Sequence, residues 1–363
     1  MVVIYHTMDD LLIFILVLCA AAVVIFFGAS YLGISIDNPL ADMFDGGGLF
    51  ASALAAVETD WSSSVGQFLI SFDHFKNIHQ VIVDDSAPLK VFDVDGNLRE
   101  NQLYASTDRG LFLSRDGGLT WNRFTSSNNE INSSSMVFKV LPASGNGEDY
   151  FISVFDGTKG YVYRTWDYFF HLDPLISFDN EAAYDMYRSG NSLYIAVSNG
   201  QLIHYHLATK ESRVVNVLSS PIIAIKQSPT GTFFLLLKSG SVMYGTHLEK
   251  PFKKLAAPGG GFLFAPKVSA IHIDSDGTIY SLNAQGIWVS YNNGSSYALL
   301  KHIPIQKTRI DAFGVSRGVL YAVSGTKMYR STDGGTNWTI TELNNSMRIN
   351  HFFFIGGRAI LSM

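Results

Sequence analysis

Three short patterns in the sequence combine residue types that could bind a metal or carry out a reaction. Residues 314–318 fit G-x-S-x-G, the turn that presents a serine nucleophile between a strand and a helix. Residues 93–97 and 274–278 place two carboxylates beside a glycine, as calcium-binding loops do. His204 and His206 stand two positions apart, so a strand would put both imidazoles on one side, where they could hold a metal.

The surroundings of these patterns do not match what their chemistry requires. No helix is expected after residue 318, and neither carboxylate pair is followed by the full ligand series of a calcium loop. We interpret both carboxylate pairs as hairpin turns, because they take the repeat position that residues 228–232 occupy as a turn. The two histidines have no third metal ligand close by in the sequence. We therefore expect no catalytic residue, metal site or cofactor.

A more specific pattern lies within residues 110–124, where two short apolar segments flank a polar turn. Ser114, Asp116, Gly118, Thr120 and Trp121 follow the spacing S-x-D-x-G-x-T-W. Serine and aspartate side chains can accept backbone N–H groups inside a tight turn, and glycine accommodates a positive φ. A tryptophan at the end can fill the gap between neighbouring sheets. These roles are structural, so the pattern predicts a fold and not a reaction.

The pattern recurs along the chain. A second full copy comprises Ser331, Asp333, Gly335, Asn337 and Trp338, and partial copies keep Ser290, Asn292 and Gly294, Thr165 and Asp167, and Ser71 and Asp73. The apolar segments before the copies begin roughly 40 to 50 residues apart, which is the period of a β-propeller blade. We therefore expect each copy to close the outer hairpin of one blade.

These residues resemble the Asp-box, or bacterial neuraminidase repeat. Together with an N-terminal anchor, the repeats are similar to those of the photosystem II stability and assembly factor-like propellers. That resemblance implies an extracytoplasmic scaffold that binds a membrane-protein partner. Sialidases also carry Asp-boxes, so a membrane-tethered glycan-binding or sialidase-like glycosidase propeller is the alternative. The Phe/Tyr-Arg-Ile-Pro segment of sialidases is missing near the start of the repeats, where the nearest arginines are Arg99 and Arg109.

The repeat pattern predicts an all-β domain over residues 66–363. This region is rich in β-branched and aromatic residues and in glycine-containing turns. Six units of four strands fit between its two ends. Residues 67–83 then read as an outer hairpin and residues 349–363 as an inner hairpin. Pairing them removes the open sheet edges, so we predict a seven-bladed β-propeller closed by two strands from each end.

The N-terminal region predicts a membrane anchor. Residues 1–10 form a short acidic tail, and residues 11–36 contain no charged residue and are long enough to cross the ~30 Å hydrocarbon core as one transmembrane helix. A cleaved signal peptide is the competing interpretation, but it requires a basic start and a shorter apolar run. Residues 37–65 read as a linker that could include a short apolar helix. Its possible partner contacts are Leu49, Phe50, Leu54 and Val57.

Composition limits the classes of partner. The 363 residues are 47% apolar, which is enough to bury a large core, and the formal charge of −5 provides no basic surface for nucleic acid. The single cysteine, Cys19, excludes an intrachain disulfide. The predicted anchor, the apolar linker, the missing catalytic set and the role that the resemblance implies lead to one prediction. We predict a non-enzymatic, single-pass membrane protein whose extracytoplasmic propeller acts as a protein-binding scaffold, assembly factor or accessory subunit of an integral membrane protein complex.

Overall fold

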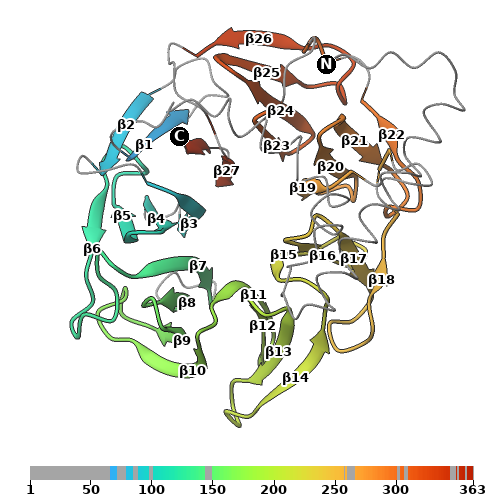
Figure 1. The fold of residues 1–363 in the computed structure, drawn as a ribbon. Helices are drawn as coiled ribbons and strands as arrows, with labels where there is room; N and C mark the ends of the chain where they lie inside the picture. Colours follow the sequence, from blue (N-terminus) through green and yellow to red (C-terminus); the bar gives the residue numbers. More distant parts are fainter. Residues whose placement is uncertain are drawn as a thin grey trace, which may run out of the picture. The chain divides into compact units, whose positions relative to one another are not determined.

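The computed structural model describes residues 66–71, 79–84, 89–97, 101–143, 149–256, 258–259, 266–300, 303–305, 310–343, 349, 351–355 and 358–362. These residues form strands and turns, and the strands build seven four-stranded antiparallel sheets. Figure 1 shows the sheets arranged as blades around a common axis. The prediction of an all-β, seven-bladed propeller is confirmed.

The predicted transmembrane helix at 11–36 and the linker at 37–65, with Leu49, Phe50, Leu54 and Val57, lie outside the described residues. Within the described part of the chain, no helix is long and apolar enough to cross a membrane.

Six blades each use four consecutive strands, numbered here from the innermost outward. Blade 1 contains β3 (Val91–Asn97), β4 (Gln102–Thr107), β5 (Gly110–Ser114) and β6 (Asn122–Phe124). Blade 2 contains β7 (Met136–Pro142), β8 (Tyr150–Phe155), β9 (Lys159–Thr165) and β10 (Asp173–Asp179). Blade 3 contains β11 (Ala183–Ser189), β12 (Ser192–Val197), β13 (Gln201–His206) and β14 (Ser212–Val217).

The next three blades follow the same order. Blade 4 contains β15 (Ile222–Gln227), β16 (Phe233–Leu237), β17 (Val242–Gly245) and β18 (Lys253–Lys254). Blade 5 contains β19 (Val268–Ile273), β20 (Ile279–Asn283), β21 (Gly286–Ser290) and β22 (Ala298–Leu299). Blade 6 contains β23 (Ala312–Ser316), β24 (Val319–Ser324), β25 (Lys327–Ser331) and β26 (Thr339–Glu342).

Blade 7 joins the two ends of the propeller. Its inner strands are β27 (His351–Ile355) and β28 (Arg358–Ser362), and its outer strands are β1 (Gly66–Ser71) and β2 (His79–Asp84). Strand β1 pairs with β28 in antiparallel register, with Leu69 opposite Leu361 and Ile70 opposite Ile360. The predicted closure by two strands from each end is therefore confirmed.

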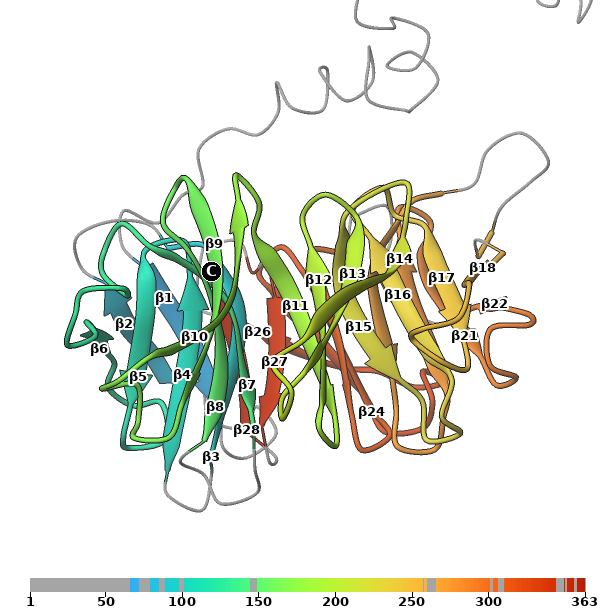
Figure 2. The same cartoon turned by 90° about the horizontal axis from the view of Figure 1, so that it is seen from below.

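The second strand of each of blades 1 to 6 is almost entirely buried. All five residues of β16, Phe233–Leu237, are buried, and the same holds for β20, Ile279–Asn283. Neighbouring blades stand side by side (Figure 2), so a central strand is covered on both faces, and in β16 it carries a continuous apolar run. The core therefore consists of successive layers between adjacent blades.

The innermost strands share an irregularity near their start. In β3, β7, β11, β15 and β19, one residue near the start of the strand has no partner residue on the second strand of the blade, which is a β-bulge. A bulge changes the direction in which a side chain points. The bulged positions are Phe92, Phe138, Tyr184, Ile223 and Ser269.

The sequence interpretation of residues 93–97 as a hairpin turn is wrong. Strand β3 continues through all five residues, and Asp93 and Asp95 lie opposite Ser106 and Tyr104 of β4. These residue types favour turns, but here they pair with β4 as part of a strand. The chain reverses direction only after Asn97. Residues 274–278 and 228–232 do form turns.

Candidate functional site

Residues 114–121 form the turn between the third and fourth strands of blade 1. The Ser114 hydroxyl donates to Asp116 Oδ1 at 2.8 Å and accepts the Gly118 N–H at 2.7 Å. Asp116 accepts the N–H of Thr120 at 2.9 Å and its hydroxyl at 2.6 Å. The Trp121 indole donates to the Gly118 carbonyl at 2.9 Å, and Gly118 has a φ of +104° that favours glycine. These polar groups hold the turn together.

The second full copy forms the corresponding turn of blade 6. Ser331 donates to Asp333 at 2.8 Å and accepts the Gly335 N–H at 2.8 Å. Asp333 accepts the Asn337 N–H at 2.9 Å, so asparagine replaces the threonine without loss of this bond. The Trp338 indole donates to the Gly335 carbonyl at 2.9 Å. The two turns therefore share one hydrogen-bond pattern.

The partial copies keep part of this pattern. In blade 5, Ser290 donates to Asn292 at 3.0 Å and accepts the Gly294 N–H at 2.9 Å. In blade 7, Ser71 is fully buried at the end of β1, and Asp73 lies outside the described residues. None of the described copies lies on an innermost strand, so these residues are not brought to the axis of the propeller.

The two full turns also hold their carboxylates ionised. Burial acts to raise the pKa of Asp116, but hydrogen bonds from Thr120 and Ser114 outweigh it and lower the pKa to about 2. Hydrogen bonds from Asn337 and Ser331 lower the pKa of Asp333 to about 2. Such groups are poor proton donors at neutral pH, which agrees with a structural role.

The other chemical patterns lack the arrangement that their reactions need. Ser316 ends β23 and is followed by a turn into β24, not by a helix. The rings of His204 and His206 make an edge contact at 6.4 Å. Within the described residues, no group of three histidine, cysteine, aspartate or glutamate side chains is placed to hold a metal ion.

The bulges of the innermost strands create an apolar surface that the sequence analysis missed. Phe92, Phe138 and Tyr184 belong to blades 1, 2 and 3, and their rings touch in series at centroid distances of 4.6 and 5.0 Å. Ile223 takes the same position in blade 4 and is 39% exposed. We call these four side chains the inner arc. The Lys90 ammonium lies 5.4 Å from the Phe92 ring at one end of it.

Charged side chains follow the inner arc on the same strands. Lys139 Nζ lies 2.8 Å from Asp93 Oδ2, and Asp185 accepts the Ile225 N–H at 2.7 Å. Burial opposes protonation of Lys139, but the charges of Asp93 and Asp185 raise its pKa above the ordinary value. The lysine is therefore a fixed cation held between carboxylates of blades 1 and 3.

Two further groups near the axis have perturbed pKa values. Burial raises the pKa of Asp95, and the neighbouring charge of Asp93 raises it further. Burial lowers the pKa of His272 to about 4, and the positive charge of Lys226 acts in the same direction. At neutral pH His272 is therefore uncharged, and the innermost strands combine an apolar arc with a nearly balanced set of charges.

The inner arc had a weak signal in the sequence. Phe92, Phe138 and Tyr184 each stand immediately before a charged residue near the start of an innermost strand. An alignment of the repeats on their inner hairpins could have revealed this recurrence. It could not have shown that the rings touch, because the contact depends on the bulge and on the angle between blades.

Comparison with known proteins identifies the fold. No family model matches the chain, and no curated protein sequence matches it. Among solved structures, YCF48 bound to D1 peptide is similar with a TM-score of 0.59 and 13% identity, over 75% of this chain and 93% of that one. YCF48 from Cyanidioschyzon merolae has a TM-score of 0.60 and 15% identity, over 76% and 93%. The extracellular domain of BT4673 from B. thetaiotaomicron has a TM-score of 0.56 and 14% identity, over 76% and 38%.

Proposed function

We propose that this chain is a non-enzymatic, membrane-anchored propeller that binds a protein partner. It would act as an assembly factor or accessory subunit of an integral membrane protein complex. In this proposal residues 11–36 are the anchor, the propeller is extracytoplasmic, and the turns of blades 1 and 6 are Asp-boxes. The likeness to YCF48 bound to D1 peptide supports the proposal by analogy of fold.

The inner arc is the observation that carries the proposal. Three aromatic rings in contact and one exposed isoleucine make a rigid apolar surface at the start of four neighbouring strands. Aromatic side chains are enriched at the centre of protein interfaces, where few residues supply most of the binding energy, and polar residues form the surrounding rim. We therefore place the partner on the inner arc.

Substituting Phe138 tests this placement, because its ring contacts both Phe92 and Tyr184. We expect Phe138→Ala to weaken partner binding by about 2 kcal/mol, or roughly 30-fold, as for an interface hot spot. The measurement is co-purification of the tagged chain from native membranes in mild detergent, followed by titration with the partner recovered.

Trp166→Ala is the matched control, since Trp166 is aromatic and 54% exposed but lies in the rim turn of blade 2. This variant is expected to bind as the unmodified chain does. A chain that purifies alone contradicts the proposed function. Equal binding by the Phe138→Ala variant contradicts the inner arc as its site.

A glycosidase remains the second candidate because of two carboxylates on one innermost strand. Asp93 and Asp95 are two positions apart on β3, so their Cα atoms are separated by roughly 6–7 Å. Asp93 forms an ion pair with Lys139, and the pKa of Asp95 is raised. Glycoside hydrolysis uses two carboxyl groups in different roles, and the one that acts as the acid has a raised pKa.

Hydrolysis of a panel of chromogenic glycosides tests this candidate. A glycosidase of this kind predicts turnover that Asp95→Asn reduces by at least about 100-fold, because the general acid is removed. Absence of turnover, or turnover unaffected by the substitution, excludes the assignment of Asp95.

A further inference from the structure

A cavity lies between blades 3 and 4. Its volume is about 250 Å³, just below the roughly 300–1,000 Å³ of sites for drug-sized ligands. Its lining includes Ser189, Tyr194, Phe233, His247, Glu249 and Lys250. A site of this size suits a single small ring.

The cavity occurs where two successive blades lack the Ser-x-Asp-x-Gly turn. Tyr205 of blade 3 and Gly245 of blade 4 stand where blade 1 has Ser114, judged by strand register. The segment after Gly245 instead reaches blade 3, where the Asn216 amide donates to the carbonyls of Leu248 at 2.7 Å and Lys250 at 3.2 Å. These bonds fix the backbone on both sides of residue 249.

Glu249 is thereby held in a defined orientation. Its Oε1 accepts the Tyr194 hydroxyl at 3.1 Å and lies 3.2 Å from His204 Nδ1, and its Oε2 lies 2.5 Å from Arg213 Nη2. The His204 ring stacks on Tyr194 at 5.0 Å, and its Nε2 lies 2.8 Å from the Ser192 hydroxyl. The carboxylate is part of a built network.

The network sets the charge of the site. Burial acts to raise the pKa of Glu249, but hydrogen bonds from Arg213 and Tyr194 outweigh it and lower the pKa. Burial raises the pKa of Tyr194, so this phenol stays protonated and donates. The negative charge of Glu249 is balanced by Arg213, so the ligand need not be charged. A carboxylate has about four lone-pair sites, so at least one remains to accept a hydrogen bond.

The rest of the lining is divided between apolar and polar groups. Phe233 and Leu248 are 8% and 3% exposed and supply an apolar wall. Ser189 and Lys250 add polar donors. A ligand that fits must present an apolar face and, around its edge, groups that both donate and accept hydrogen bonds.

A pyranose ring has these properties, since its C–H bonds form an apolar face and its hydroxyls line the edge. We propose that the cavity between blades 3 and 4 binds one pyranose unit of a neutral glycan. Only one carboxylate lines the cavity, and glycoside hydrolysis uses two, so the site binds without cleaving. This site is independent of the inner arc and of the proposed protein partner.

Ligand-observed NMR on the full chain in nanodiscs tests the proposal, because many detergents carry sugar head groups that would compete. The probes are glucose, galactose, mannose and N-acetylglucosamine, with glucuronate, glucosamine and inorganic phosphate as charged comparisons. We expect saturable binding of at least one neutral sugar. Glu249→Gln should weaken it at least about tenfold, because it removes a charge-assisted hydrogen bond. Ser189→Trp should abolish binding by filling the cavity.

Tyr187→Phe is the matched control, since the Tyr187 hydroxyl bonds to Gln227 at 2.6 Å and does not line the cavity. It should bind sugar as the unmodified chain does, and thermal unfolding confirms that each variant is folded. The proposal is overturned if no neutral sugar binds saturably, if only charged probes bind, or if Glu249→Gln and Ser189→Trp leave binding unchanged.

Discussion

The Ile360→Asp variant is expected to lose most of the stability of the propeller. Ile360 lies on β28 between Phe353 of β27 and Ile70 of β1, and its side chain is fully buried. An aspartate there would place a carboxylate without a partner in an apolar cluster. We expect the free energy of unfolding to fall by more than about 4 kcal/mol, out of the 5–15 kcal/mol typical of folded proteins.

The effect should concentrate at the closure of the ring. Strand β28 links the two halves of blade 7, so weakening it also frees β1 and β2. Urea unfolding measures the loss, and limited proteolysis should show early cleavage near residues 66–84. Ile340→Asp is the control, because Ile340 is 51% exposed on β26 and its substitution should change stability by no more than about 0.5 kcal/mol. Equal midpoints for the two variants would show that the closure is not a point of weakness.

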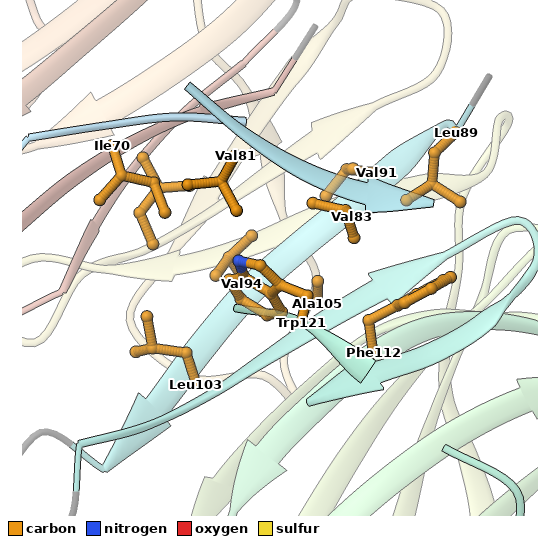
Figure 3. Close-up of a cluster of buried hydrophobic side chains, with 11 residues drawn as sticks. Ile70, Val81, Val83, Leu89, Val91, Val94, Leu103, Ala105, Phe112 and Trp121 are labelled. Carbon is orange, nitrogen blue, oxygen red and sulfur yellow. The ribbon is translucent and has the colours of Figure 1, made fainter. Parts of the chain in front are cut away.

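The Trp121→Ala variant is expected to lose about 3–5 kcal/mol of stability, the usual cost of emptying an aromatic site in a core. Trp121 is 7% exposed and lies in a cluster with Val94, Leu103 and Phe112 of blade 1. The cluster also includes Ile70, Val81 and Val83 of blade 7. Figure 3 shows the indole among these side chains. The tryptophan therefore packs the first blade against the closing blade.

Urea unfolding of this variant has a control of the same residue type. Trp166→Ala removes a side chain that is 54% exposed, so its midpoint should lie close to that of the unmodified chain. Partner binding by folded Trp121→Ala protein should be unchanged, since Trp121 is not part of the inner arc. A midpoint unaffected by Trp121→Ala would contradict the role of the turn as a connection between blades.

Together the two variants separate stability from binding. Ile360 and Trp121 lie in one apolar cluster between blades 7 and 1, whereas Phe138 and Glu249 belong to surfaces on other blades. Substitutions in the first group should lower stability, and those in the second should weaken binding with little change in the unfolding midpoint. This division can be checked on one set of purified variants.

The sequence by itself determined the repeat and its closure. The spacing Ser114, Asp116 and Gly118 specifies a local turn, because the side chains of Ser114 and Asp116 each accept a backbone N–H four residues further on and Gly118 accommodates a positive φ. Hairpins that recur at a constant period predict blades, and two incomplete hairpins at the ends predict the joint blade. These features depend on contacts that are short in sequence or repeated, so a single chain is enough to reveal them.

Only the tertiary structure revealed the inner arc and the cavity between blades 3 and 4. The ring contacts of Phe92, Phe138 and Tyr184 join three blades, and the network around Glu249 joins residues up to 55 positions apart. Pairing of β3 with β4 likewise overrode the turn expected at residues 93–97. Such arrangements depend on strand register and on the angle between neighbouring sheets. Neither is encoded by residue type at one position, because register arises when strands pair within a blade and the angle arises when separate blades pack together.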